Sequence, residues 1–488
     1  MPAATCSKPT TWLQIAAPVL IGMVLLTRTV CLAAGKPAKG PVCEMYAPGH
    51  FGNSYECAGI LEMRRILAEA KHWGFNHYSD WFDMVDCGDP FNSGRLHNLG
   101  NELWDRKKAH FKSAQSLGLP CSLMMTPNHV YNDQLRPEWL AKKTRRFFGQ
   151  LICPSVPGAR KAILTNYTNL FRDLKASGIR LSGVGFYPFD YGGCACEKCK
   201  PWIKTYAVLS YEIYKIARTY HPGVEMHHVG WWWSKTEHEI FAKWADSEAP
   251  GVVKSIALHI PYGKTTVGDV RLPKGCRRRA FVHIGYGEKA EPRDKYGHLG
   301  PVIASKRIAR TVTDLRQQGV TGVMAYCEGL FEDVNKALLA GIYTGRYDNP
   351  DAVLVDYARR YFQANPAQAK QWAKWLASWG EPYARDATAA LSELETLPGN
   401  KMDWRRRQWE LKARMFVAHH KVMQLRSWTP KRLALAEEFF SAHEECQREV
   451  WGLGPQRHIF APKFTPLSWY AGWAKHQGQN ASKMGSEQ

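Results

Sequence analysis

The sequence lacks the short motifs that mark several classes of hydrolase, metalloenzyme and nucleic-acid-binding protein. It has no G-x-S-x-G motif, which argues against the common serine esterases and leaves other nucleophiles open. It has no H-x-H or H-E-x-x-H pattern, which argues against a catalytic metal site built from its histidines. No nucleic-acid-reading motif is recognisable, so we expect no nucleic-acid partner.

Long apolar runs are also scarce, and the one that stands out lies near the N-terminus. Lys8 is followed by an apolar segment from Leu13 to Leu26 and then by small residues before Gly35. This pattern is typical of a cleavable secretory signal, which we place at residues 1–34. The apolar segment is short for a membrane span, and an uncleaved anchor is the alternative. We therefore expect a secreted or periplasmic protein with no stable membrane insertion after cleavage.

Acidic residues are few relative to basic ones. The chain has 65 Lys and Arg against 44 Asp and Glu, which gives a formal net charge of +21 at pH 7. This excess favours an acidic partner such as a uronic or sulfated polysaccharide. The alternative is a solvated basic surface, because the basic residues are spread along the chain. Aromatic residues are abundant at 12%, with 19 Trp, and flat aromatic faces suit sugar rings as well as protein cores.

Short apolar strands alternate with amphipathic helices over most of the chain. This alternation predicts parallel βαβ units, and eight of them form a closed (β/α)8 TIM barrel, which we place at residues 40–348. The strands are expected at Val42–Ala47, Phe75–Phe82, Pro120–Thr126, Ser182–Tyr187, Val224–Trp233, Val253–Pro261, Arg279–Tyr286 and Val320–Cys327.

Strand patterns cease after Asn349-Pro350. The remaining segments have helical periodicity, so we expect an α-helical domain at residues 349–474 and a disordered polar tail at 475–488. Helices are predicted at Ala352–Phe362, Ala367–Trp379, Trp404–Leu425 and Arg432–Trp451.

A compact cysteine motif follows the predicted fourth strand. Of the thirteen cysteines, two fall in the predicted signal, which leaves an odd number and excludes full pairing. Cys194, Cys196 and Cys199 have the spacing C-x-C-x-x-C, and Cys153 follows the neighbouring third strand. Three thiolates and Cys153 would complete a tetrahedral structural zinc site with no open position for catalysis. A disulfide from Cys153 to Cys194 or Cys196 is the alternative.

Two motifs carry a resemblance to known enzymes. Cys153-Pro154-Ser155 together with a downstream acid and the C-x-C-x-x-C run resembles the family forty-two β-galactosidases, in which such cysteines hold zinc beside the acid/base strand. Asp190-Tyr191-Gly192-Gly193 and the segment from Glu328 to Lys336 resemble bacterial α-glucuronidase-like and endo-N-acetylglucosaminidase-like barrels. The similarity spans about residues 40 to 360 in element order. It implies a TIM-barrel glycoside hydrolase that needs no catalytic cofactor.

Glycoside hydrolysis requires two carboxyl groups that flank the scissile bond. We expect Asp190 to be the general acid/base, because it lies in a glycine-rich, aromatic-flanked loop in which partial burial would raise its pKa. The β-galactosidases have Asn-Glu where this chain has Phe189-Asp190, so the identity of their acid does not transfer. For the partner we favour Glu328 after strand eight, and Glu288 after strand seven is the alternative that the resemblance implies.

Polar and aromatic residues recur at the predicted strand ends, where TIM barrels hold their substrates. Three consecutive tryptophans follow strand five, and neighbours in a strand alternate sides, so they cannot all face one core. The expected carbohydrate-binding residues are Asp80, Trp81, Asn128, His129, Tyr187, His228, Trp231, Trp232, Trp233, His259, His283 and Tyr326.

Three functional hypotheses remain open from the sequence. The first is an exported glycoside hydrolase that acts on a polysaccharide or glycan. The second is a carbohydrate-binding barrel without catalysis, which would have aromatic platforms and no facing carboxyl pair. The third is another carbohydrate-active enzyme, such as a lyase.

Overall fold

The computed structural model describes residues 40–47, 59–92, 94, 99–142, 151–188, 192–261, 264–284, 303–326, 333–379, 386–399, 403–425, 427 and 429–451. The expected signal peptide and C-terminal tail lie outside these residues, as do Asp190, Glu288 and Glu328. The predicted domain limits therefore stay predictions.

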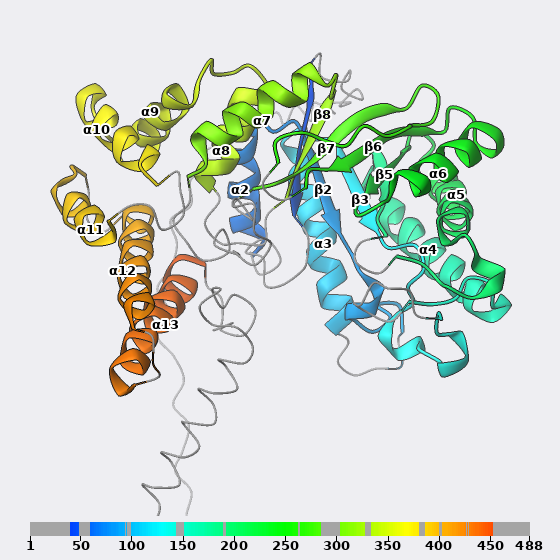
Figure 1. Ribbon diagram of the computed structural model, residues 1–488. Helices are drawn as coiled ribbons and strands as arrows, with labels where there is room; N and C mark the ends of the chain where they lie inside the picture. Colours follow the sequence, from blue (N-terminus) through cyan, green and yellow to red (C-terminus); the bar gives the residue numbers. More distant parts are fainter. Residues whose placement is uncertain are drawn as a thin grey trace, which may run out of the picture. The chain divides into compact units, whose positions relative to one another are not determined.

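Eight parallel strands close into a barrel in sequence order (Figure 1), which confirms the expected fold class. Most expected bounds differ from the observed ones by one to a few residues, because propensity defines strand ends poorly. The strands are β1 (Val42–Ala47), β2 (His77–Trp81), β3 (Cys121–Met125), β4 (Gly183–Phe186), β5 (Glu225–Gly230), β6 (Val253–His259), β7 (Arg277–His283) and β8 (Gly322–Tyr326).

Helices connect successive strands, except β6 and β7, between which no helix is described, and they pack their apolar stripes against the outer face of the barrel. Helix α6 begins with a capping box, in which Ser234 accepts from the backbone N–H of Glu237 and the Glu237 carboxylate accepts from the Ser234 N–H. The barrel helices are α2 (Ile60–Trp73), α3 (Leu99–Ser116), α4 (Pro157–Ala176), α5 (Trp202–Tyr220), α6 (Lys235–Glu248), α7 (Ser305–Gln317) and α8 (Asp333–Tyr343).

The C-terminal region is helical, as expected. Within the described residues, helices α12 and α13 pack along each other (Figure 1), and α9 packs on both α10 and α8. No described helix has the length and apolar character that a membrane span requires. These helices are α9 (Pro350–Tyr361), α10 (Pro366–Ala377), α11 (Ala387–Thr396), α12 (Trp404–Gln424) and α13 (Pro430–Trp451).

A buried polar network fills the half of the barrel nearest the strand N-termini. The Arg279 guanidinium on β7 donates to the Glu44 carboxylate on β1, and both side chains are almost fully buried. His77 Nε2 lies 2.8 Å from Ser122 Oγ, and His227 Nδ1 lies 2.9 Å from Ser255 Oγ. Burial is the largest single effect on Glu44 and would raise its pKa, but Arg279, His77 and Ser79 together outweigh it, and the pKa falls to about 2. Glu44 is therefore ionised inside the barrel.

An apolar layer separates this network from the strand C-termini. Met124, Val229, Ala257, Phe281 and Met324 belong to one buried cluster. Two glycines of β4 make room for it and for the layer below. A Cβ at Gly185 would lie 2.2 Å from Met124 Sδ, and one at Gly183 would lie 2.5 Å from Ser122 Oγ. The barrel interior is therefore a packed core.

Several buried histidines make the stability of the fold depend on pH. Burial lowers the pKa of His77, His238 and His259 to about 4, and that of His228 to about 3. An unfolded histidine titrates near pH 6.5. Between about pH 6.5 and pH 4 the unfolded chain thus binds protons that the folded chain does not, so stability is lost as the pH falls. Each such histidine contributes a slope of about 1.4 kcal/mol per pH unit.

Urea unfolding at about pH 7.5, 6.0 and 5.0 measures this slope. His228 is the best single test, because it packs 4.7 Å from Phe241 between ring centroids and its Nδ1 has one hydrogen-bond partner, the Tyr206 hydroxyl at 3.1 Å. His228→Phe is expected to reduce the slope by one histidine's share, and an unchanged slope would contradict this account.

Candidate carbohydrate site at the barrel mouth

Aromatic side chains from several strands converge inside the C-terminal end of the barrel. Tyr46 of β1 lies 5.8 Å from Tyr187 and 5.7 Å from Tyr326 between ring centroids. Trp81 of β2 lies 5.2 Å from Tyr187. All four side chains belong to the same buried cluster as Met124 and Phe281. Burial raises the pKa of Tyr46 well above its usual value, so its hydroxyl is neutral and remains a hydrogen-bond donor.

Trp231 and two histidines form the opposite wall of this mouth. The Trp231 indole lies flat against the His283 imidazole, with centroids 4.8 Å apart and an interplanar angle of 6°. Its centroid is 4.1 Å from that of His259, at the end of β6. Burial holds His259 neutral at physiological pH. Neutral imidazoles both donate and accept hydrogen bonds, as sugar hydroxyls require.

The three consecutive tryptophans point in three different directions. Trp231 faces the barrel interior, and Trp232 is 51% exposed. Trp233 packs into the outer layer against Phe241 of α6, with centroids 4.9 Å apart. The alternation argument therefore holds, and the structure gives Trp233 a packing position away from the mouth.

Two other expected binding residues also face the outer layer of the barrel. Asp80 receives hydrogen bonds from Lys107 of α3 at 2.8 Å and from the Tyr78 hydroxyl at 2.5 Å. Burial alone would raise the pKa of Asp80, but Lys107 and His110 outweigh it and lower it. His228 packs between α5 and α6, as described above. The structure thus places both residues between strand and helix and does not bring them to the interior.

Asn128 and His129 follow β3 and are buried. The backbone carbonyl of Asn128 accepts from the backbone N–H of Ile152 at 2.9 Å. The side-chain amide nitrogen of Asn128 donates to the backbone carbonyl of Ile152 at 3.5 Å. His129 Nδ1 contacts the Asp83 carboxylate, which follows β2. These contacts connect the segments after β2 and β3 to each other and to the segment that carries Cys153. Asn128 and His129 therefore hold these segments in place, whether or not they also contact substrate.

Tyr46 is the mouth residue that the sequence interpretation missed. Its side chain faces the barrel interior near the C-terminal end of β1. Trp81 was predicted as a binding residue because it occupies the corresponding end of β2. The apolar run around Tyr46, Val42–Ala47, resembles any buried strand. The sequence therefore did not distinguish Tyr46 from a core residue.

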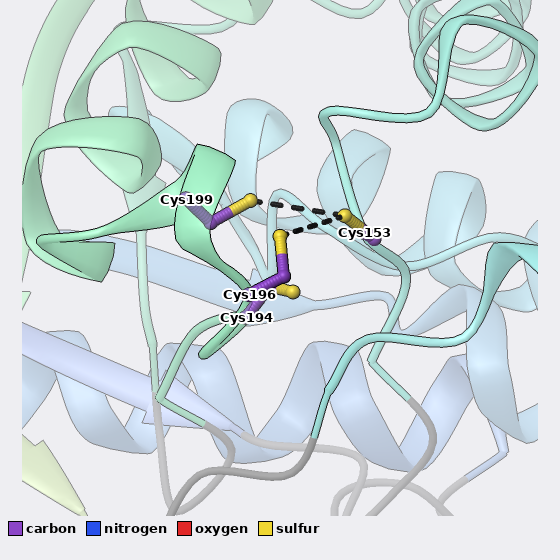
Figure 2. A group of neighbouring side chains, drawn as sticks. All are labelled: Cys153, Cys194, Cys196 and Cys199. Atoms are coloured by element: carbon purple, nitrogen blue, oxygen red, sulfur yellow. Dashed lines mark hydrogen bonds between the residues drawn. The ribbon is translucent and has the colours of Figure 1, made fainter.

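The four motif cysteines form one cluster (Figure 2). Cys153 reaches it from the segment after β3, whereas Cys194, Cys196 and Cys199 come from the segment after β4. Cys153 Sγ lies 3.8 Å from Cys196 Sγ and 3.7 Å from Cys199 Sγ, and all four sulfurs lie within 4.8 Å of one another. All four are free thiols, as are the other cysteines whose side chains the structure describes.

The electrostatics of the cluster differ from one thiol to the next. Burial raises the pKa of Cys194 to about 11, and it also raises the pKa of Cys199. Burial is the largest single effect on Cys196 and would raise its pKa, but the hydrogen bonds from Cys199, Cys194 and Cys153 together outweigh it, and the pKa falls to about 7. The Ser155 hydroxyl lies 2.9 Å from Cys199 Sγ. Four thiols at these separations are a donor set that can hold a metal ion.

No protein-family model matches the chain, and no curated protein matches its sequence. Solved structures of glycoside hydrolases resemble the chain, and two of them reach a TM-score above 0.5. A family 89 enzyme from Clostridium perfringens, in complex with GlcNAc-α-1,4-galactose, is 10% identical over 84% of this chain and 53% of its own, with a TM-score of 0.51. A family 89 glycoside hydrolase from Clostridium perfringens in complex with PUGNAc is 10% identical over 83% of this chain and 54% of its own, with a TM-score of 0.51. A pneumococcal exo-β-D-N-acetylglucosaminidase module has 9% identity, 70% and 97% coverage and a TM-score of 0.41.

The chain is therefore a (β/α)8-barrel protein of the architecture found in the two family 89 structures. It spans about half the length of the two family 89 structures. At this level of identity the likeness defines the fold, and the site must define the chemistry.

Proposed function

We propose that the protein is an exported glycoside hydrolase that cleaves O-glycosidic bonds in a polysaccharide or glycan. The observation that carries the proposal is the lining of the barrel mouth, where aromatic rings from most strands converge with the imidazoles of His259 and His283. Such a lining offers apolar faces for the C–H surfaces of sugars and hydrogen-bonding groups for their hydroxyls. Export rests on the signal-like N-terminal sequence.

Asp190 is the proposed general acid/base, with Glu328 as its partner and Glu288 as the alternative. By sequence they follow β4, β8 and β7, and the carboxyl ends of barrel strands meet at the mouth. Asp190 would protonate the leaving oxygen, while the partner attacks the anomeric carbon or activates water. Described acids near the strand ends have other partners: Asp80 binds Lys107, Asp83 contacts His129, and Asp333 accepts from the Tyr357 hydroxyl.

Two observations suggest two different classes of substrate. The Clostridium perfringens structure contains a GlcNAc-galactose substrate, which supports a test of N-acetylhexosamine-containing glycans. The formal net charge of +21 supports a test of uronic and sulfated glycans. Purified protein should therefore be screened on neutral, N-acetylated and acidic glycans, with products resolved by mass spectrometry. Hydrolysis products are expected; unsaturated products would indicate a lyase, and binding without turnover would indicate a non-catalytic barrel.

The cysteine cluster is proposed to hold a structural zinc ion. Four sulfurs at about 2.3 Å from a tetrahedral zinc lie about 3.8 Å from one another. The distances from Cys153 Sγ to Cys199 Sγ, 3.7 Å, and to Cys196 Sγ, 3.8 Å, agree with this separation. A disulfide would require a separation of about 2.0 Å. Zinc there would tie the segment that precedes Cys153 to the segment that follows Asp190, with no open coordination position for catalysis.

Removal of one cluster cysteine is expected to abolish zinc binding. Cys199→Ser should reduce the zinc content from about one ion per chain to near zero and lower the stability by several kcal/mol, because binding energy at a structural site is folding energy. Elemental analysis and urea unfolding measure both effects. Cys276→Ser is the matched control, since Cys276 lies outside the cluster. A metal-free wild-type protein whose mass spectrum shows a disulfide from Cys153 would contradict the zinc assignment.

A further inference from the structure

Trp232 combines two features that a folded protein normally avoids. Its side chain is 51% exposed, which leaves a large apolar ring in water. Its backbone has φ of 57°, in the left-handed region that suits glycine or asparagine, and Gln363 is the only other described non-glycine residue there. Both features cost stability, so packing does not account for a tryptophan at this position.

The turn that carries Trp232 is held at both ends. Before it, Trp231 is fixed by its flat contact with His283 and by His259. After it, Trp233 is buried against α6, and the Ser234 capping box starts that helix. The Trp202 indole N–H donates to the Glu237 carboxylate of the same box at 2.6 Å. The left-handed residue is therefore the point at which the chain turns from the barrel interior to the outer layer, and it pushes its own side chain outward.

The surroundings of the exposed ring are aromatic. The Trp231 ring is 5.6 Å away and perpendicular to it, at 85°. The His259 ring is 5.4 Å away, at 41°. Together they place the Trp232 indole at the rim of the mouth between β5 and β6, beside the interior wall. A flat apolar face with a hydrogen-bonding neighbour matches a pyranose ring, which has C–H groups on its faces and hydroxyls at its edges.

We propose that Trp232 is a stacking subsite for a pyranose ring at the rim of the barrel, and that its strained backbone is retained to present the indole there. This inference rests on the proposed function and deepens it. A ring stacked on Trp232 is a different ring from one held among the interior aromatics. The substrate class is therefore a glycan of at least two sugar units, and a single monosaccharide leaves this subsite empty.

Binding measurements test the subsite without relying on turnover. The probes are tetrasaccharides of N-acetylglucosamine, of glucose and of galacturonic acid, together with the corresponding monosaccharides, titrated by calorimetry into full-length protein. At least one tetrasaccharide is expected to bind the wild type. Trp232→Ala should raise its Kd about 10-fold or more, and Trp232→Phe should raise it less, because a smaller ring retains part of the face. Monosaccharide affinity should not change.

Leu61→Ala is the matched control, since Leu61 is another exposed apolar side chain, 83% accessible on α2. It should leave every Kd unchanged. Trp232→Asn tests the backbone argument: asparagine tolerates positive φ, so this variant should unfold at the same or a higher temperature than the wild type while its tetrasaccharide affinity drops.

Three results would overturn the inference: equal tetrasaccharide affinity in the wild type and Trp232→Ala, no binding of any tetrasaccharide to the wild type, or a large loss of thermal stability in Trp232→Asn. Each can be separated from failure of the hydrolase proposal. If the tetrasaccharides bind through Trp232 but no glycan is hydrolysed, the subsite stands and the catalytic assignment fails.

Discussion

Asp190→Asn is expected to lower kcat/KM by about 100- to 10,000-fold on the best substrate of the glycan screen, because an amide cannot protonate the leaving oxygen. Substrates with activated aryl leaving groups should lose much less, since their departure needs little protonation. The pH profile of the variant should also lose one limb, the one that reports the general acid. Steady-state kinetics on both substrate types measure these effects, and circular dichroism checks folding.

The control for this variant is a carboxylate with no expected part in catalysis. Asp269 has a side chain that is 98% exposed and lies 3.9 Å from Arg278. Asp269→Asn should therefore leave the kinetics unchanged. Unchanged turnover in folded Asp190→Asn would reject the assignment of Asp190. Glu328→Gln and Glu288→Gln then identify the partner, because only the variant that lacks the second catalytic carboxylate should lose turnover.

Arg279→Met is expected to destabilise the fold by about 3–5 kcal/mol, because it leaves the Glu44 carboxylate buried without its cation. The pKa of Glu44 should then rise from about 2, as burial raises it when no charge opposes it. In the wild type, the folded pKa lies below the unfolded one. Glu44 thus stabilises the fold above pH 4.5, and this contribution is lost as the pH falls towards 2. Urea unfolding near pH 7 measures the loss.

The same strand supplies the control for Arg279. Arg277 lies 2.9 Å from Glu225, and both side chains are about half exposed. Arg277→Met should cost only about 0–1 kcal/mol, because water screens this pair. The double variant Glu44→Gln/Arg279→Met should recover much of the lost stability, since it removes the orphaned charge. A loss below about 1 kcal/mol for Arg279→Met would contradict the buried ion pair.

The architecture could be predicted from the sequence because hydrophobic periodicity records it. The expected first strand coincides with β1, and the predicted helix at Trp404–Leu425 differs from α12 by one residue. Helices α8 and α11 were not identified. Ala387–Thr396 is short and follows a proline- and glycine-containing stretch, and α8 is buried on all sides, so its apolar residues show no stripe.

The direction of each side chain was harder to predict, and Asp80 and His228 show why. A strand of a parallel barrel is buried on both faces, so hydrophobicity does not distinguish the interior from the helix layer. Trp81 and Trp231 face the interior, whereas their near neighbours Asp80 and His228 face outward. The cysteine cluster could be predicted, because its spacing constrains the geometry directly. The residues proposed for catalysis lie outside the described part of the chain, so they remain predictions from sequence.

The apolar layer around Met124 and Phe281 bears on how this protein could be re-engineered. It insulates the ionised network beneath it from the rim above, so changes on one side should have little effect on the other. A combinatorial library aimed at new sugar specificity can therefore diversify Trp232, His259 and Tyr46 while the lower half of the barrel stays fixed. A second library, directed at the lower half, would change the contributions of His77 and Glu44 to acid tolerance and leave substrate preference as it was.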